Sequence, residues 1–397
     1  MADTPMGTIS IAPNVYWVGV KDHSRKLFDG LISLSHGTSY NAYLVVGSEK
    51  TAVIDTTNPG FEQVLDDKIS QHADITKIDY VIMNHAEPDH ANAAKYVLEK
   101  AKGAMLVTTA KGKEFALAEY GIPGDRVMVV DEGSSIDLGG KTLKFIDAPW
   151  LHWPETMFTY LEEDGILFPC DFFGSHIAYG QFYADEFGYE NTLDLAKLYF
   201  AEIMMPFRAQ GKKALEKVRA LNPRIIAPSH GVIHRDPKFI MDAYADWTDA
   251  KMKRKVLIAY VSMWGSSKKM ADVLHEALVK KGIEVQIYDL TATEMGLVAK
   301  ELVDTPVLVI AAPTVLAGVH PVAAYAALLV KALRAPTKYA AVLTSHLWSG
   351  GAVKQLSEIL GTTKIEIIGV VDAKGAPRKE DLDAVLVLAD TIEKKLG

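Results

Sequence analysis

The stretch His85-Ala86-Glu87-Pro88-Asp89-His90 brings two imidazoles and two carboxylates together within six residues. It follows residues 80–83, an apolar run that predicts a buried strand ending in a loop. Loops at strand ends are where α/β folds place their chemistry. Four such side chains would repel or desolvate one another unless they shared a cation, so the stretch indicates a metal site. The alternative is a polar N-terminus for a helix over residues 91–102.

Three later residues able to bind metal also follow apolar, strand-like runs. They are His152, Asp171 and His230, and the runs before them are residues 142–146, 165–169 and 224–227. A lone His or Asp in such a place usually satisfies a backbone group instead. Three of them in order, after the dense stretch at 85–90, favour one metal site assembled from four loops.

Composition excludes several other classes of protein. The chain has 397 residues, enough for two domains, and its 49% hydrophobic and 23% charged content is ordinary for a globular protein. A net charge of −8 argues against a general nucleic-acid binder, because phosphate contacts need a basic face. We expect no signal peptide and no membrane span, since no apolar run approaches ~20 residues. The single cysteine, Cys170, excludes an intramolecular disulfide and fits a reducing cytoplasm.

The second half of the chain predicts alternating strands and helices. A charged run at residues 251–255 precedes an apolar strand, so we expect domains over residues 1–250 and 254–397. Five strands then alternate with five helices, the pattern of a flavodoxin-like doubly wound sheet. The predicted strands are 256–261, 283–288, 307–311, 340–343 and 365–371, and the predicted helices are 268–281, 292–302, 321–333, 351–360 and 379–395.

The order of the candidate ligands resembles that of the metallo-β-lactamase fold, whose usual zinc version carries His-x-His-x-Asp-His in its first loop. Glu87 stands where that pattern has its second His. Carboxylates with some imidazole suit a metal that must reach a ferric state, whereas nitrogen-rich sites suit zinc. Together with residues 37–44, residues 151–154 and the second domain, the whole chain resembles the flavodiiron proteins, also called A-type flavoproteins. The resemblance implies an α/β chain with an N-terminal metallo-β-lactamase-like αβ/βα sandwich followed by a flavodoxin-like doubly wound parallel sheet domain.

The resemblance also implies ligands for two iron ions. They are His85, Glu87 and His152 for one iron, Asp89, His90 and His230 for the other, and Asp171 as the bridge between them. Family members differ in whether the imidazole matching His90 reaches its iron.

Two positions near this site depart from the family pattern. The family often has a His after the Phe of the segment matching residues 28–30, where it would donate a proton or hydrogen bond to bound gas; this chain has Asp29. Relatives often have two adjacent tyrosines in the segment matching residues 198–201, and this chain has only Tyr199. The catalytic candidates beside the ligands are therefore Asp29 and Tyr199, with core packing as an equal alternative for Tyr199.

Three loops of the second domain resemble the FMN-binding loops of flavodoxins. The first offers hydroxyls and backbone N–H groups at a helix N-terminus, where the helix dipole favours a phosphate; a capped turn is the alternative. In the third, Trp348 can stack on a flavin. The expected FMN-binding residues are Ser262, Met263, Trp264, Gly265, Ser266, Ser267, Pro313, Thr314, Val315, Leu316, Ala317, Ser345, His346, Leu347, Trp348, Ser349 and Gly350.

The resemblance implies a terminal reductase that passes electrons from an external donor through FMN to two irons. It would reduce dioxygen to water, nitric oxide to nitrous oxide, or both. The implied donor is a rubredoxin or a reduced deazaflavin coenzyme, with no nucleic acid or membrane as partner. We expect a cytoplasmic head-to-tail homodimer or dimer of dimers. The basic run at 251–255 is either a docking site for an acidic carrier or, as the favoured alternative, a solvated linker.

Two other functions compete with this one. A zinc-dependent hydrolase with an appended flavodoxin-like domain is disfavoured by Glu87, which replaces a nitrogen ligand with a carboxylate. A non-catalytic electron carrier, whose first domain serves only dimerisation, should have lost ligands, and none of the seven is lost. Cys170, next to Asp171, is expected to be a buried and inert thiol.

Overall fold

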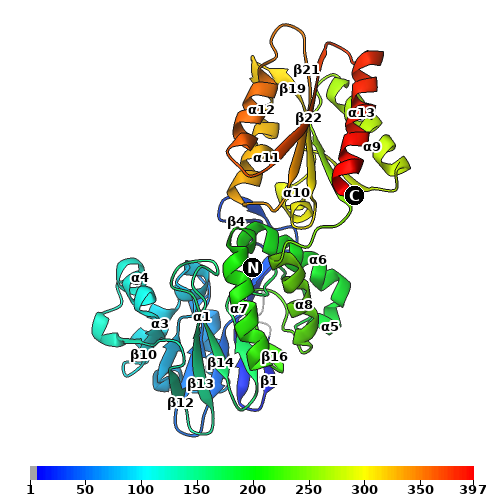
Figure 1. The fold of residues 1–397 in the computed structure, drawn as a ribbon. Helices are drawn as coiled ribbons and strands as arrows, with labels where there is room; N and C mark the ends of the chain where they lie inside the picture. Colours follow the sequence, from blue (N-terminus) through cyan, green and yellow to red (C-terminus); the bar gives the residue numbers. More distant parts are fainter. Residues whose placement is uncertain (1–6) are drawn as a thin grey trace. The chain divides into compact units, whose positions relative to one another are not determined.

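The computed structural model describes residues 7–397, which form two compact units. The first unit holds the described residues up to Phe200 together with Phe207–Ala245. The second holds Ala201–Pro206 and Asp246–Gly397, so it includes a short segment that no sequence pattern assigned to it. In Figure 1 the chain runs from blue to green through the first unit and ends in red in the second.

The first unit is built on two sheets that face each other. One has the strand order β1-β2-β7-β8-β9-β10-β11 and the other β12-β13-β14-β15-β16. Side chains from both sheets, among them Trp17, Phe145 and Phe168, share one buried core. A second core joins the outer face of the first sheet to its helices. These layers are the predicted αβ/βα sandwich.

The strands of the first unit are mostly short. They are β1 (Ile9–Ala12), β2 (Val15–Trp17), β3 (Val20–Asp22), β4 (Leu27–Phe28), β5 (Ile32–Ser33), β6 (Thr38–Tyr40), β7 (Tyr43–Val46), β8 (Thr51–Ile54), β9 (Tyr80–Ile82), β10 (Met105–Thr108), β11 (Val127–Val129), β12 (Ser135–Asp137), β13 (Thr142–Asp147), β14 (Met157–Leu161), β15 (Ile166–Phe168) and β16 (Ile225–Ile226).

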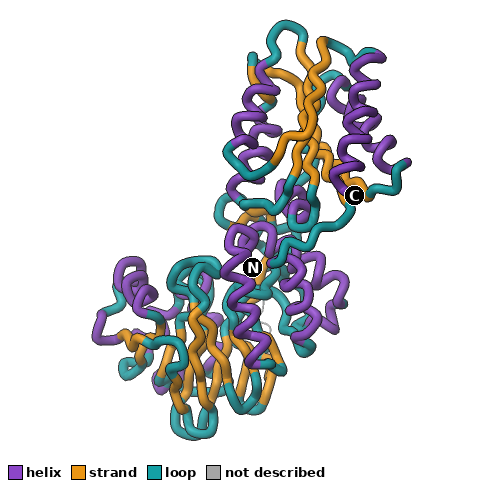
Figure 2. The backbone as a smooth tube through the Cα atoms, viewed as in Figure 1, coloured by secondary structure: helices purple, strands orange, loops and turns teal. Residues whose placement is uncertain are grey.

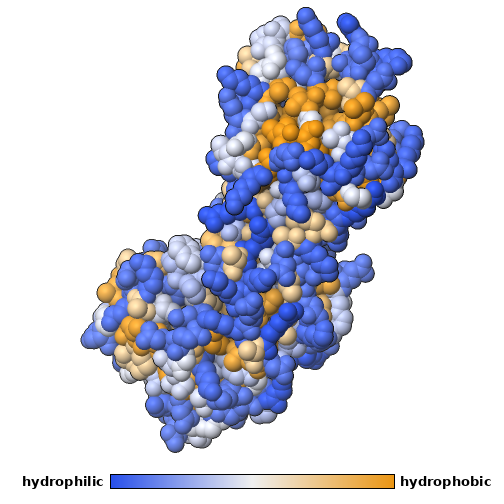
Figure 3. All heavy atoms as spheres, viewed as in Figure 1, coloured by the Kyte–Doolittle hydropathy of each residue, from blue (hydrophilic) through white to orange (hydrophobic). Residues whose placement is uncertain are grey.

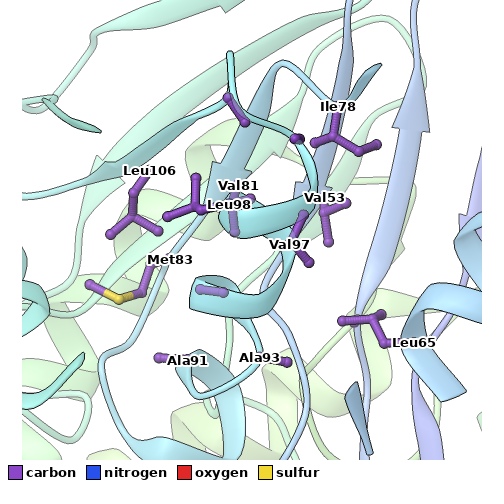
Figure 4. Packing of buried hydrophobic residues seen from close by; sticks show 14 of the residues in the cluster. Val53, Leu65, Ile78, Val81, Met83, Ala91, Ala93, Val97, Leu98 and Leu106 are labelled. Atoms are coloured by element: carbon purple, nitrogen blue, oxygen red, sulfur yellow. The ribbon is translucent and has the colours of Figure 1, made fainter. Parts of the chain in front are cut away.

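The helix-side core holds the His85–His90 loop in place. Figure 4 shows Val81 and Met83 at the end of β9 packed in the same cluster as Val97. Met83 and Ala91, on either side of the loop, are both essentially inaccessible to solvent. Because both ends of the loop are anchored in packed apolar surface, the polar residues between them are held rigidly.

The second unit has a parallel sheet in the order β18-β17-β19-β21-β22. This order is that of flavodoxin-like doubly wound sheets, and it confirms the predicted fold class. Figure 2 shows helices on both faces of this sheet. The strands are β17 (Lys255–Tyr260), β18 (Glu284–Asp289), β19 (Val307–Val315), β20 (Gly318–Val319), β21 (Tyr339–His346) and β22 (Glu366–Lys374).

Helices connect the strands of both units. They are α1 (Glu62–Ile69), α2 (Pro88–Ala91), α3 (Ala94–Lys100), α4 (Ala110–Tyr120), α5 (Ala184–Phe187), α6 (Tyr189–Tyr199), α7 (Arg208–Leu221), α8 (Pro237–Thr248), α9 (Ser266–Lys280), α10 (Met295–Leu302), α11 (Pro321–Ala332), α12 (Gly351–Gly361) and α13 (Lys379–Leu396). Short 3₁₀ turns lie at Ile75–Lys77, Gly124–Arg126 and Met205–Phe207, and a π-helical turn at Phe200–Met204.

Local chemistry explains several helix ends. At α4, the Thr109 side chain accepts a hydrogen bond from Gly112 N–H, and Gly121 ends the helix in the left-handed conformation. At α11, Pro321 occupies the first turn, where its missing N–H costs nothing, and the His320 side chain accepts from Val322 N–H.

The prediction of one continuous helix over residues 91–102 is wrong. The structure has α2 and α3 there, separated at Asn92 and Ala93. The His90 carbonyl accepts hydrogen bonds from the Thr56 N–H and hydroxyl, at 2.6 and 2.7 Å. That carbonyl is thereby used by a tertiary contact instead of the next helical turn, so the helix restarts beyond it.

The sheet of the second unit has an apolar edge strand, β22. Figure 3 shows a patch of hydrophobic residues on this unit, and Val370 in the edge strand β22 is 45% exposed. Charged side chains, Glu366 and Lys374, stand at the two ends of the strand, as is common for exposed edges. Over residues 7–397, no helix combines the length and the apolar character that crossing a bilayer requires.

The basic run at 251–255 is tied down within the second unit. Lys251 pairs with Asp246, and Lys253 pairs with Asp304 at 3.1 Å. Lys255 is buried and pairs with Glu301 and with Glu284. These intramolecular pairs fix the run against the second unit, while the Lys251 and Lys253 side chains stay 69% and 59% exposed. Docking of an acidic carrier here stays a prediction.

Candidate metal centre and flavin loops

Four loops at strand ends deliver the seven predicted metal ligands to one place. The residues lie after β9, after β13, after β15 and after β16. Six of the seven are buried, and the most exposed side chains are those of His152 at 13% and Glu87 at 11%. Ligand atoms of His85, Glu87, His152 and Asp171 all lie within 4.8 Å of one another, as do those of Asp89, His90 and His230.

In the first cluster, three side-chain atoms surround one point. His85 Nε2 lies 3.1 Å from Glu87 Oε2, and His152 Nε2 lies 2.9 Å from the same oxygen. Two ligands that each bind an ion at about 2.0–2.2 Å, at angles of about 90–110°, lie roughly 3.0–3.5 Å apart. The spacing therefore fits a shared metal ion.

The second cluster has the same spacing. Asp89 Oδ2 lies 3.1 Å from His230 Nε2 and 3.4 Å from His90 Nε2. Both carboxylate oxygens of Asp89 are buried, and neither forms a hydrogen bond within the described part of the chain. Buried polar atoms without a partner require an explanation, and an ion between Asp89 and the two imidazoles supplies one.

Asp171 faces both clusters. Its Oδ2 lies 3.6 Å from His85 Nε2 and 3.5 Å from His152 Nε2. Its Oδ1 lies 3.1 Å from His90 Nε2 and 3.4 Å from His230 Nε2. A single carboxylate with one oxygen toward each cluster is the geometry of a bridge between two metal ions, so the residues fit the implied pair.

The electrostatics of the clusters favour charged groups. Burial opposes charge on the imidazoles, but hydrogen bonds with Glu155 and Glu87 outweigh it and raise the pKa of His85 to about 10. Burial likewise opposes charge on Asp171, but His90 and His152 hold the pKa of this carboxyl well below its usual range. Without a metal, protonated imidazoles pair with ionised carboxylates. A metal ion that takes the place of these protons must therefore release them.

Sequence reasoning missed Glu155. Its Oε1 accepts hydrogen bonds from His85 Nδ1 at 2.6 Å and from Ala86 N–H at 2.9 Å. A carboxylate on the far nitrogen of a ligating imidazole fixes the tautomer and the ring orientation. No spacing pattern announces this residue, because its role depends on β14 bringing it beside a loop 69 residues away along the chain.

We expect Glu155→Gln to lower metal affinity about 10- to 100-fold, because the amide leaves His85 less basic and less fixed. The measurement is metal retained per chain after dialysis against a graded chelator. Glu114→Gln is the matched control, since Glu114 is exposed and its pair with Lys111 lies in α4. Equal retention in Glu155→Gln and the parent would contradict this role.

Of the two predicted catalytic residues, Tyr199 contacts a predicted ligand directly, whereas Asp29 lies at the surface nearby. The Tyr199 hydroxyl, which is buried, donates to Asp171 Oδ1 at 2.8 Å, so the side chain does more than pack. Asp29 is exposed, in the turn between β4 and β5, with a left-handed φ of 51°. Partial burial and the charges of Glu87 and Asp89 raise its pKa, which places this carboxyl within electrostatic reach of the clusters.

Cys170 lies within 4.8 Å of His90 and Asp171 but is a poor ligand. Burial and the neighbouring carboxylates of Asp55 and Asp171 raise the pKa of its thiol well above the usual value. Because the thiolate is the form that binds metal, the buried thiol stays inert.

The first flavin loop precedes α9 as predicted. Gly265 adopts a φ of 88° and its N–H donates to Ser262 Oγ at 3.1 Å, which turns the chain into the helix. The Ser267 hydroxyl is buried and has no hydrogen-bond partner in residues 7–397. A free hydroxyl at the start of a 15-residue helix fits a bound phosphate group.

The second flavin loop is a β-hairpin instead of an open loop. β19 continues to Val315 and pairs with β20, so Leu316 and Ala317 form the two-residue turn, with φ of 48° and 63°. Positive φ at both turn residues is the type I′ geometry, which non-glycine residues adopt under strain. A Cβ at Gly351 would lie 1.9 Å from the Ala317 carbonyl oxygen, so the start of α12 packs directly on this turn.

Large apolar side chains project from all three loops. Trp264 is 90% exposed, Leu316 92% and Trp348 78%. The Thr314 hydroxyl, two residues before Leu316, is buried and unpartnered within the described residues. Exposed apolar groups together with unsatisfied polar ones fit a large aromatic ligand such as FMN.

Comparison with known proteins agrees with this architecture. A family model described as ODP family beta lactamase matches residues 38–231, and one described as flavodoxin matches residues 258–387. The chain is 37% identical over 98% of its length to a nitric oxide reductase of Moorella thermoacetica, 99% of which is covered. It is 32% identical over 94% of its length to a coenzyme F420H(2) oxidase of Methanothermobacter marburgensis, 95% of which is covered.

Two solved structures share the fold throughout. The rubredoxin oxygen:oxidoreductase of Desulfovibrio gigas matches with a TM-score of 0.95, 30% identity and 98% coverage of both chains. The flavodiiron protein of Giardia intestinalis matches with a TM-score of 0.94, 31% identity and coverage of 98% of this chain and 97% of that one.

The fold and the clusters define a two-domain flavoprotein in which a metallo-β-lactamase-like unit carries a carboxylate-rich dinuclear site. The chain belongs to the flavodiiron protein family. The family and fold class predicted from the sequence are therefore confirmed. The individual ligand, FMN and catalytic residues remain predictions, which the geometry above supports.

Proposed function

We propose that this protein is a terminal reductase that takes electrons from a separate carrier through FMN and uses two irons to reduce dioxygen to water, nitric oxide to nitrous oxide, or both. The observation that carries the proposal is Asp171, whose two oxygens each face one cluster of ligands. Relatives of this protein are named nitric oxide reductase, coenzyme F420H(2) oxidase and rubredoxin oxygen:oxidoreductase. The protein is therefore an oxidoreductase.

The proposed ligands are those predicted from the sequence. His85, Glu87 and His152 would hold one iron, Asp89, His90 and His230 the other, and Asp171 would bridge them. Three carboxylates among seven ligands suit iron that cycles between ferrous and ferric states better than they suit zinc. When bound, the irons supply coordination of the gas and electrons for its reduction, and FMN supplies electrons to the irons.

The protein's own residues orient and shield this chemistry. Glu155 fixes the His85 ring, and the Tyr199 hydroxyl fixes Asp171 by donating to Oδ1. Phe28 and Trp153 place aromatic rings 5.9 Å from His230 and 5.0 Å from His85, which limits water around the ligands. Asp29, exposed and with a raised pKa, is the group proposed to exchange protons with solvent.

The proposal extends to the electron donor, the assembly and the location. We propose a rubredoxin or a reduced deazaflavin coenzyme as donor, since one relative is named a coenzyme F420H(2) oxidase and another a rubredoxin oxygen:oxidoreductase. A head-to-tail dimer, or a dimer of dimers, would bring the flavin of one chain to the metals of another. The protein is proposed to act in the cytoplasm.

The deciding experiment is the metal and flavin content of protein purified without added metal. Two irons and one FMN per chain are expected. Zinc with little iron, persisting after iron-supplemented expression, would favour the hydrolase. Flavin without any metal would favour the electron carrier.

We expect Trp348→Ala to weaken FMN binding about tenfold, because it removes an aromatic face against the flavin. Titration of the apoprotein by quenching of FMN fluorescence gives the dissociation constant. Tyr325→Ala is the control, since Tyr325 is an exposed aromatic residue on α11 of the same unit. An unchanged dissociation constant in Trp348→Ala would show that the ring does not stack on the flavin.

A further inference from the structure

His346 and Asp372 form a partly exposed pair at the base of the third flavin loop. His346 is the last residue of β21, and its Nδ1 lies 2.9 Å from Asp372 Oδ1 on β22. The Thr344 hydroxyl donates to the same carboxylate oxygen at 2.6 Å. With Nδ1–H directed at the carboxylate, the imidazole keeps Nε2 free to take a proton.

The loop folds back over this pair. A Cβ at Gly350 would lie 3.4 Å from Asp372 Oδ2 and 3.5 Å from His346 Cε1, which is ordinary van der Waals contact, so the loop backbone passes directly beside the pair. The side chains of His346 and Asp372 are 20% and 28% exposed. Leu347 and Trp348, the next residues, project into solvent. The imidazole therefore lies directly beside the loop that is proposed to hold the flavin.

We propose that the His346–Asp372 pair takes up a proton when FMN bound by these loops is reduced, and so couples the flavin's potential to pH. The inference rests on the proposed function, because it requires FMN in the three loops. It adds a proton acceptor to the flavin unit that the reduction of gas at the metals does not itself require.

With FMN bound, two electrons from a reductant such as dithionite and one proton from solvent would reduce it and leave one negative charge on the flavin. A second proton from solvent binds Nε2 of His346, whose new positive charge lies between that negative charge and the Asp372 carboxylate. The whole reduction then consumes two electrons and two protons.

Some groups around His346 favour a protonated imidazole and others oppose it. Asp372 on β22 favours the protonated imidazole. Lys374, which is opposite His346 in the β21–β22 register, opposes it, as does the positive end of α12 that begins at Gly351. Asp372 is the charged group in direct contact, so we expect its effect to dominate.

The test is the midpoint potential of the bound FMN, measured by spectroelectrochemistry from pH 5 to 9 with dithionite as reductant. One proton per two electrons gives a slope of about 30 mV per pH unit and two protons give about 59 mV. The parent is expected to show the steeper slope over part of this range. His346→Gln should show the shallower slope throughout, and Asp372→Asn should move the steep segment to lower pH.

The controls separate this inference from the proposed function. His275→Gln, on α9 of the same unit, should retain the parent profile. A parent protein that holds FMN, but whose slope is unchanged in His346→Gln, overturns the inference alone. A parent that binds no FMN overturns the proposed function and the inference with it. If His346→Gln does not fold, an Asp372→Asn profile identical to the parent overturns the inference equally.

Discussion

Asp171→Asn should retain at most one metal ion per chain and lose gas reduction by more than about 100-fold. The aspartate has one oxygen toward each cluster, whereas the asparagine has a single oxygen and no charge. The amide nitrogen would also face two imidazole nitrogens at 3.1–3.6 Å, where a donor cannot replace an anionic ligand. Metal analysis and oxygen or nitric oxide consumption measure the two effects.

Asp66→Asn is the matched control for this substitution. Asp66 is also a buried aspartate of the first unit, and it accepts hydrogen bonds from Tyr96 and Ser70 away from the clusters. It should retain both metals and the parent rate. Two irons and full activity in Asp171→Asn would show that the assignment of the bridge is wrong.

Glu202→Gln should stabilise the second unit at pH 8.5 and leave it unchanged near pH 4. Burial, and then the nearby Glu294, raise the pKa of Glu202 to about 8. In the unfolded chain the carboxyl ionises near its ordinary pKa of 4.5, so stability falls as pH rises from 4.5 and the loss is complete above about 8. Each pKa unit corresponds to about 1.4 kcal/mol, which gives a gain of about 3–5 kcal/mol for the glutamine at alkaline pH.

Thermal release of FMN, followed by flavin fluorescence, reports unfolding of the second unit at each pH. The shift should be about 2–4 °C for each kcal/mol gained. Glu301→Gln is the contrasting control, because Glu301 is paired with Lys255, and its loss should destabilise the unit at pH 8.5. The same release temperature for Glu202→Gln and the parent at pH 8.5 would show that Glu202 is not held neutral.

The sequence could bring together the seven predicted ligands because each lies within eight residues of the end of a strand. Four of them lie in the short stretch His85–His90 and the others follow three further strands, so local patterns singled them out as candidates, and the family resemblance supplied their assignment to two irons. Glu155 carries no such signal, because its contact with His85 exists only once β14 lies beside the loop after β9. The hydrogen bond from Tyr199 to Asp171 likewise depends on tertiary packing, and the sequence left two alternatives open.

The second unit followed its pattern closely, since strands and helices alternate there with clear apolar periods. The structure of this unit differs from the predicted pattern in a loop that is proposed to bind FMN. The loop expected after residue 311 is a hairpin, because β19 extends to Val315 and pairs with β20. In the first unit, the helix expected over 91–102 is broken where Thr56 takes the His90 carbonyl. Long-range hydrogen bonds of this kind are invisible to patterns read along one segment.

The hydrogen bond from Tyr199 makes the two halves of the Asp171 carboxylate unequal. Oδ1 shares its lone pairs with the tyrosine hydroxyl, whereas Oδ2 has no hydrogen bond within the described residues. A donor oxygen already engaged by a proton binds a cation less strongly, so the position beside His90 and His230 should be the weaker of the two. Metal would then load in sequence, first between His85 and His152, and a half-filled protein would be a stable species during assembly.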